Sequence, residues 1–151
     1  MGTAELVQQV TAHVKDVERM QEMIHKARSA SAKFSAAVVE KVVKDNTAKC
    51  NEVAAKVAPL TSEMASRIDG LKAKRDGVIV GSQEAKFTLQ ELELRHLVGE
   101  YDADAFAGLA AEPQATVAAA DAQVTELEGE VGALEAAIAA WAEIAGRSGL
   151  A

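Results

Sequence analysis

Apolar residues recur along the chain at alternating spacings of four and three, which is the spacing of a heptad seam on an α-helix. The first run lies in residues 3–57, a stretch without proline or glycine. Its apolar stripe consists of Leu6, Val10, His13, Val17, Met20, Ile24, Ala27, Ser31, Phe34 and Val38. The stripe then steps over by one residue and continues as Val39, Val43, Asn46, Cys50, Val53, Val57 and Leu60. A one-residue step rotates the apolar face, so we expect this long helix to change its twist or its partner there.

A second helix is expected over residues 61–98. Pro59 disfavours helix at the residue before it, so the sequence predicts a break or kink at 58–61. The seam positions that follow are Met64, Ile68, Leu71, Arg75, Val78, Ser82, Ala85, Leu89, Leu92 and His96. The β-branched run 78–80 lies between two glycines, but the heptad passes through it, which favours a weakened helix over a lone strand.

The segment 99–112 interrupts the heptads and is expected to connect two helices. Gly99 suits a helix C-cap, Asp102 can cap a short turn, and Pro113 fits the first turn of a new helix. The third helix is expected over 113–146, where the spacing has no miss. Its seam consists of Val117, Ala120, Val124, Leu127, Val131, Leu134, Ile138, Trp141 and Ala145.

The lengths of these segments favour a single all-α coiled-coil domain over residues 1–151. At about 1.5 Å per residue the second and third helices match, and their short connection predicts an antiparallel hairpin. The first helix is longer, so the fold is either an elongated antiparallel coiled-coil hairpin or an up-down-up three-helix bundle with a long first helix. In the antiparallel pairing, the basic e positions of the second helix, Lys72 and Lys86, are expected to face the acidic e positions of the third, Asp121, Glu128 and Glu135.

Composition supports long helices and limits the classes of partner. Alanine supplies 32 of the 151 residues, and aromatic residues make up only 3%. The net charge is −7, and residues 99–151 carry ten acids against the single base Arg147. Without a basic stripe the chain is not expected to bind nucleic acid. No secretory signal and no apolar run of membrane-spanning length is present, so we expect no membrane insertion and a cytoplasmic location.

Few residues could carry chemistry. Two Glu-x-x-His pairs, Glu22 with His25 and Glu93 with His96, have the spacing used by di-iron carboxylate bundles. The first pair points away from the apolar stripe, however, so surface residues are the simpler interpretation. Cys50 lies on the seam, where a small buried side chain is the usual role. The sequence therefore predicts no catalytic site, no metal and no cofactor.

The stretch from Glu91 to Phe106, ELELRHLVGEYDADAF, resembles a segment of uncharacterised bacterial coiled-coil proteins. In that family a hairpin coil is often followed by a small zinc ribbon. The resemblance implies a hairpin coil and no enzymatic activity. The cysteine pairs of the ribbon are absent from this chain, so the zinc site does not carry over. The long hairpin is also similar to stalk proteins of secretion apparatus.

These observations favour a non-enzymatic scaffold or adaptor that acts through helix-mediated protein contacts. A stalk or chaperone-like component of a larger, secretion-type assembly is one alternative, and a di-iron carboxylate oxidoreductase is another. The overhanging first helix predicts a homo-oligomer or a tight complex with a protein partner, because an uncovered apolar stripe usually marks an interface. The expected contact residues are Val17, Met20, Ile24, Phe34 and Asn46, the last as a buried amide that fixes register.

Overall fold

The computed structural model describes residues 1–150, and within them the chain is all-helical, without strands. Three helices follow one another: α1 (Thr3–Ser29), α2 (Ala36–Leu97) and α3 (Ala103–Arg147). The all-α class expected from the heptads is confirmed. The chain forms two compact units: unit 1 contains Met1–Ile68 together with the segment that begins at Gly132, and unit 2 is Asp69–Val131.

The first expected helix, 3–57, is two helices, and the long helix is α2 rather than the first one. The chain reverses at 30–35, at the point where the apolar stripe steps over by one residue. Ser35 begins the new helix, because its Oγ accepts a hydrogen bond from the backbone N–H of Val38 at 3.4 Å. The shift of the stripe therefore marks a turn and not a change of twist. Three serines near the turn lower the local helix propensity without any glycine or proline.

The break expected at 58–61 is absent, since Pro59 lies inside α2. Proline removes the hydrogen bond to the carbonyl four residues earlier, which is that of Ala55. Both Ala55 and Pro59 are exposed, so water can solvate that carbonyl. The helix continues because Val57 and Met64, on its other face, are completely buried. Packing on both sides of the proline outweighs a local cost of roughly 3 kcal/mol.

The connection between α2 and α3 covers 98–102 rather than 99–112. Gly99 ends α2 with φ of +85° and donates its N–H to the carbonyl of His96, while the Glu100 N–H reaches the carbonyl of Arg95 at 2.8 Å. This pair of bonds is a Schellman cap. Asp102 then caps α3 at once, because its Oδ1 accepts from the Ala105 N–H at 2.8 Å. The alanine-rich stretch that follows is strongly helix-forming, so Pro113 falls inside α3.

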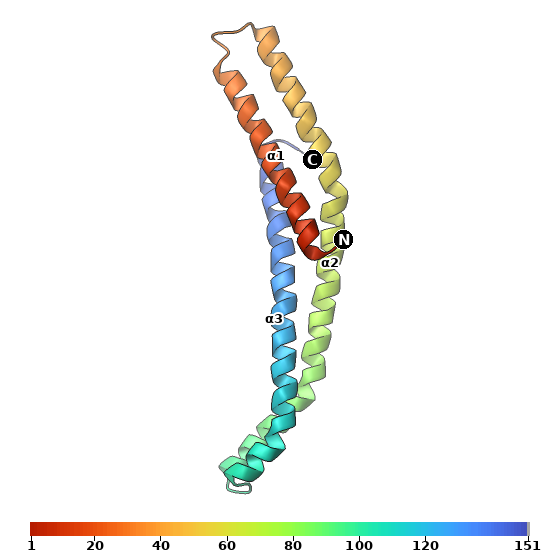
Figure 1. The fold of residues 1–151 in the computed structure, drawn as a ribbon, viewed down its shortest axis with the longest axis vertical. Coiled ribbons are helices and arrows are strands. Elements are labelled where there is room, and N and C mark those ends of the chain that lie inside the picture. The colour runs from red at the N-terminus through yellow and green to blue at the C-terminus, as the bar shows by residue number, and fades with distance from the viewer. Residues whose placement is uncertain (151) are drawn as a thin grey trace. The chain divides into compact units, whose positions relative to one another are not determined.

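In unit 1, α1 folds back antiparallel on the first part of α2, and the last part of α3 lies beside them (Figure 1). Near the turn, Ile24 packs with Val39 and Val43 in one buried cluster. At the far end of the same helix pair, the Arg67 guanidinium donates to the Met1 carbonyl oxygen at 2.6 Å. Most of the expected seam positions in this unit are buried, but Ser31, Phe34 and Val38 of the first stripe are exposed. The buried seam members include Leu6, Val10, Val17, Cys50, Val53, Val57, Met64, Leu134 and Trp141.

Unit 2 is an antiparallel hairpin made of α2 from Asp69 onward and α3 as far as Val131. The Lys86 ammonium lies 3.9 Å from the Asp121 carboxylate, which confirms the charge pairing expected across the hairpin. The run 78–80 is helical, as expected. Among the described residues, no helix combines the length and apolar character needed to cross a membrane.

Candidate functional site

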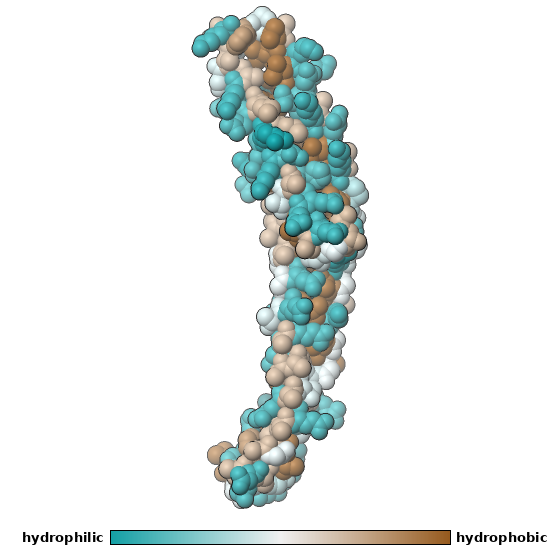
Figure 2. All heavy atoms as spheres, viewed as in Figure 1, coloured by the Kyte–Doolittle hydropathy of each residue, from teal (hydrophilic) through white to brown (hydrophobic). Residues whose placement is uncertain are grey.

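The α1–α2 turn of unit 1 leaves large apolar side chains exposed. Phe34 is 58% exposed, Val38 53% and Val42 40%. They border a shallow depression of about 240 Å³, which is lined by Ala27, Ala30, Phe34, Val38, Val39 and Val42. Figure 2 shows hydrophobic atoms at the surface of this end of unit 1 with hydrophilic ones beside them. We call this surface, residues 26–44, the apolar tip.

The apolar tip is also basic. Residues 26–44 contain Lys26, Arg28, Lys33, Lys41 and Lys44, against Glu40 as the only acid, a sum of five positive and one negative charges. Glu22 and Asp45, just outside the tip, form ion pairs with Lys26 and Lys41 at 3.1 and 3.8 Å. Within residues 1–150, Arg28, Lys33 and Lys44 form no ion pair. Three cations are therefore available beside an exposed apolar surface.

A second hollow lies in unit 2, between α2 and α3 close to their connecting turn. This groove has a volume of about 640 Å³ and is lined by Gly81, Glu84, Ala85, Thr88, Gly108, Leu109, Glu112, Pro113 and Thr116. Small residues open the space, since no atom lies within 4 Å of where a Cβ would stand at Gly81 or Gly108. Two acids, Glu84 and Glu112, and the half-exposed Leu109 give the groove an acidic and partly apolar lining.

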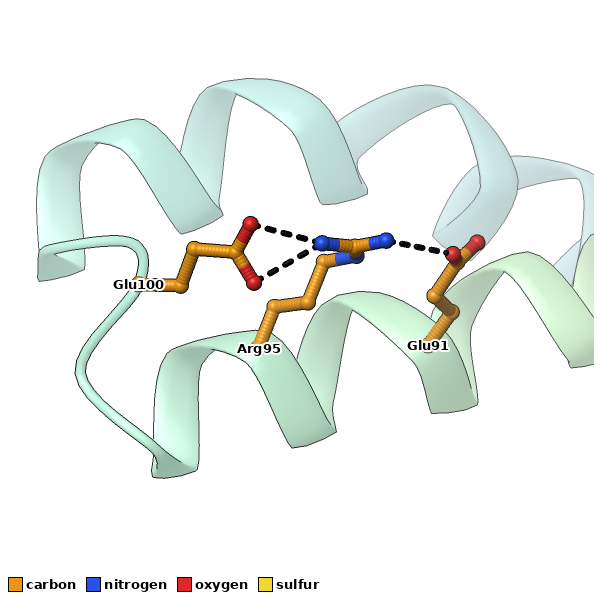
Figure 3. Close-up of polar contacts among 3 residues, drawn as sticks. All are labelled: Glu91, Arg95 and Glu100. Atoms are coloured by element: carbon orange, nitrogen blue, oxygen red, sulfur yellow. Dashed lines mark hydrogen bonds and ion pairs between the residues drawn. The ribbon is translucent and has the colours of Figure 1, made fainter.

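Beside this groove, the turn between α2 and α3 is held by local polar contacts. The Arg95 guanidinium is bonded to both carboxylate oxygens of Glu100, at 2.6 and 2.8 Å, and to Glu91 at 3.0 Å (Figure 3). The two carboxylates raise the pKa of Arg95 above its ordinary value, first through the hydrogen bond that the guanidinium donates to Glu91. His96 lies 4.9 Å from Phe106 with nearly parallel rings. The stretch 91–106 is thus a compact turn whose polar residues contact one another.

The residues expected at an intermolecular contact fall into two groups. Val17 and Ile24 are buried inside unit 1, which corrects their assignment to an interface: α1 packs on its own chain instead of leaving its stripe uncovered. Met20 is half-buried, with its Sδ 3.8 Å from Cys50 Sγ. Asn46 donates its amide N–H to the Val42 carbonyl of the same helix at 2.9 Å. Of the five residues, Phe34 alone is largely exposed.

The pairs with possible metal-ligand spacing do not assemble into a site. Glu22 and His25 are exposed on α1 in unit 1, while Glu93 and His96 are exposed on α2 in unit 2. Residues 1–150 contain no group of three or more histidine, cysteine or acidic side chains placed to hold a metal ion. The ring of His96 is used in the turn, where its Nδ1 lies 2.9 Å from the Tyr101 carbonyl oxygen. The di-iron alternative therefore has no supporting geometry among the described residues.

Cys50 is buried between the helices of unit 1, as expected for a seam position. Its Sγ contacts Met20 and lies 3.8 Å from the Gln21 amide nitrogen. Burial raises the pKa of this thiol above its ordinary value, and the hydrogen bond from Gln21 lowers it by less. A raised pKa disfavours the nucleophilic thiolate, so this cysteine has the environment of a packing residue.

Sequence reasoning named Phe34 as a contact residue, but it missed the rest of the apolar tip and the whole groove. The apolar tip depends on the chain reversal at 30–35, and the groove depends on α2 and α3 bringing Gly81 and Gly108 to the same hollow. The one usable signal was the step in the heptad at Val38. Comparisons with known protein families, with curated proteins and with solved structures found no match.

Proposed function

We propose that this chain is a non-enzymatic coiled-coil scaffold or adaptor that acts through protein contacts made by its helix surfaces. The observation that carries the proposal is the apolar tip: Phe34, Val38 and Val42 expose large apolar side chains around one depression. Apolar side chains gathered in one exposed patch typically mark an interaction site, whereas single exposed ones do not. The buried seams behind the tip, including Ile24 and Val43, hold it on rigid helices.

A site-specific crosslinking experiment tests this role. A photoreactive amino acid is placed at Val38 in the full chain, and a matched control carries it at Glu52, an exposed position on the same helix away from the tip. We expect crosslinked protein adducts from position 38 in cells and none from position 52. Equal crosslinking at the two positions, or none at either, would remove the tip as an interaction site.

The chaperone-like alternative draws on the same surface, because an exposed apolar tip can also hold unfolded chains. In that case the full chain should suppress aggregation of a heat-denatured test protein, and Val38→Asp should abolish the effect. A scaffold instead binds a folded partner at a fixed ratio. Stoichiometric adducts of defined mass from position 38 would favour the scaffold, and a heterogeneous smear would favour the chaperone-like role.

A further inference from the structure

The apolar tip of unit 1 and the groove of unit 2 are complementary in charge. The tip, residues 26–44, has a net charge of +4 from five bases and one acid; with Glu22 and Asp45 included it is still positive. Residues 81–116, which contain the groove and the adjoining turn, carry seven acids and only two bases, Lys86 and Arg95. Both of these bases already form ion pairs inside unit 2. The surface around the groove is therefore negative.

Both surfaces also carry apolar side chains that could pack together. At the tip these are Phe34, Val38 and Val42. Around the groove and the turn beside it, the exposed apolar residues are Phe87, Leu94, Leu97, Val98 and Leu109. A basic, apolar projection thus has its counterpart in an acidic hollow with apolar residues around it, and both are present on the same chain.

From this complementarity we infer that the tip of one copy docks in the unit 2 groove of a second copy, so that the chains associate head to tail. The inference rests on the proposed interaction role of the tip and names its partner. Two tips repel each other because both are basic, and two grooves repel each other because both are acidic. Only the unlike pairing brings opposite charges together while it covers apolar surface on both sides.

Such a contact is heterologous, because it joins two different surfaces of identical chains. Each copy then keeps one free tip and one free groove, so association continues until a ring closes or an open chain forms. The attraction is strongest at low ionic strength, because salt screens charges beyond about 8 Å at 0.15 M. The size of the assembly should therefore grow with protein concentration and shrink as salt is added.

Charge-reversal variants of the full chain test the pairing by sedimentation at micromolar concentration. The tip variant carries Lys33→Glu with Lys44→Glu, and the groove variant carries Glu84→Lys with Glu112→Lys. All four side chains are exposed or lie at the groove, and circular dichroism with thermal unfolding checks that both variants remain folded. We expect each variant alone to associate at least about tenfold more weakly than the wild type, because the net charge falls from +4 to 0 in the tip variant and from −5 to −1 in the groove variant.

Mixing distinguishes head-to-tail pairing from other modes. An equimolar mixture of the two variants should recover association, because the basic tip of one meets the acidic groove of the other. A control with Lys15→Glu and Lys56→Glu, which are exposed outside both surfaces, should behave like the wild type.

Other results would overturn the inference. If the groove variant still self-associates and the tip variant does not, the tips pair with each other. If the wild-type chain is monomeric at low salt, the tip of one copy does not dock in the groove of another. That result refutes the inference even if the tip crosslinks to an unrelated protein or binds vesicles of anionic phospholipid. In the crosslinking experiment at Val38, adducts to other proteins without adducts to a second copy would keep the proposed function and refute this partner. The absence of any adduct would refute both.

Discussion

The rings of His96 and Phe106 stack 4.9 Å apart across the turn that joins α2 to α3, with an angle of 18° between their planes. His96 also lies within hydrogen-bonding distance of the Tyr101 carbonyl oxygen, to which its Nδ1–H donates. One side chain at the end of α2 is thereby attached both to the connecting loop and to the first turns of α3. In the sequence, His96 belongs to one of the two Glu-x-x-His pairs of the unfavoured di-iron alternative, and the structure gives its ring a role in closing the hairpin.

Replacing His96 with alanine should weaken the turn. The substitution removes the ring stack, worth about 0.5–1.5 kcal/mol, and one hydrogen bond at an exposed position. We expect the free energy of unfolding to fall by about 1 kcal/mol, measured by urea denaturation followed by circular dichroism. His25→Ala is the matched control, because His25 is exposed on α1, and it should change stability by less than about 0.5 kcal/mol.

Substitution by alanine should change the stability of the chain in opposite directions at Gly99 and at Gly77. Gly99 has φ of +85°, which alanine adopts only with strain, so Gly99→Ala should destabilise the chain by about 1 kcal/mol. Gly77 is exposed inside α2 with no atom near its Cβ position, so Gly77→Ala should stabilise it by about 0.5–1 kcal/mol. Thermal unfolding of the two variants should therefore shift in opposite directions. Shifts of the same sign would contradict the Schellman cap.

Pro59 gives a further check on the continuity of α2. Alanine at this position restores the hydrogen bond to the Ala55 carbonyl and removes a steric conflict, so Pro59→Ala should raise the unfolding free energy by about 1–3 kcal/mol. If 58–61 were instead a break between two helices, as the sequence suggested, the same substitution would bring little gain. Chemical denaturation of the variant and the wild type separates the two cases.

A substitution at Ile24 tests whether α1 packs on its own chain, as its burial indicates, or on a second chain, as the sequence suggested. Ile24→Ala opens a cavity in the cluster with Val39 and Val43, and we expect a loss of about 2–4 kcal/mol. That loss should not depend on protein concentration, because the cluster lies within one chain. Phe34→Ala, at an exposed position, should leave the unfolding free energy within about 0.5 kcal/mol of the wild type. A concentration-dependent loss at Ile24 would show that it lies between chains.

The Cys50 thiol makes stability depend on alkaline pH. Its pKa is raised in the folded chain, so the unfolded chain ionises first as pH rises. The stabilisation from the protonated thiol is complete below the ordinary pKa and is lost as pH rises through the folded value. The advantage of the wild type over Cys50→Ala should therefore shrink as pH rises above the ordinary cysteine pKa of about 8.5. Urea denaturation at each pH measures it, and a constant difference would mean that the thiol ionises equally in both states.

The heptad pattern predicted the helical class and the seams, because burial along a helix follows spacing that is visible in the sequence. All nine seam residues of the third helix are at least half-buried. The helix ends were harder to predict, because tertiary packing overrode local signals. Pro59 and Pro113 lie inside helices, and the serine-rich turn at 30–35 has no glycine or proline to announce it. The two surfaces depend on which residues the folded chain brings together, so spacing along one helix could not reveal them.

Unit 1 is discontinuous along the chain, and this has a consequence for how the protein is made. Its core combines residues 1–68 with the segment that begins at Gly132, whereas unit 2 is one uninterrupted segment. During synthesis, α1 can pair with the start of α2 early, but Leu134 and Trp141 reach that core only after all of unit 2 has been synthesised. Contacts between residues this far apart in sequence form late, because closing the long intervening loop costs entropy. We therefore expect the unit 2 hairpin to form on the ribosome before the first unit is finished, although the first unit contains the residues that are made first.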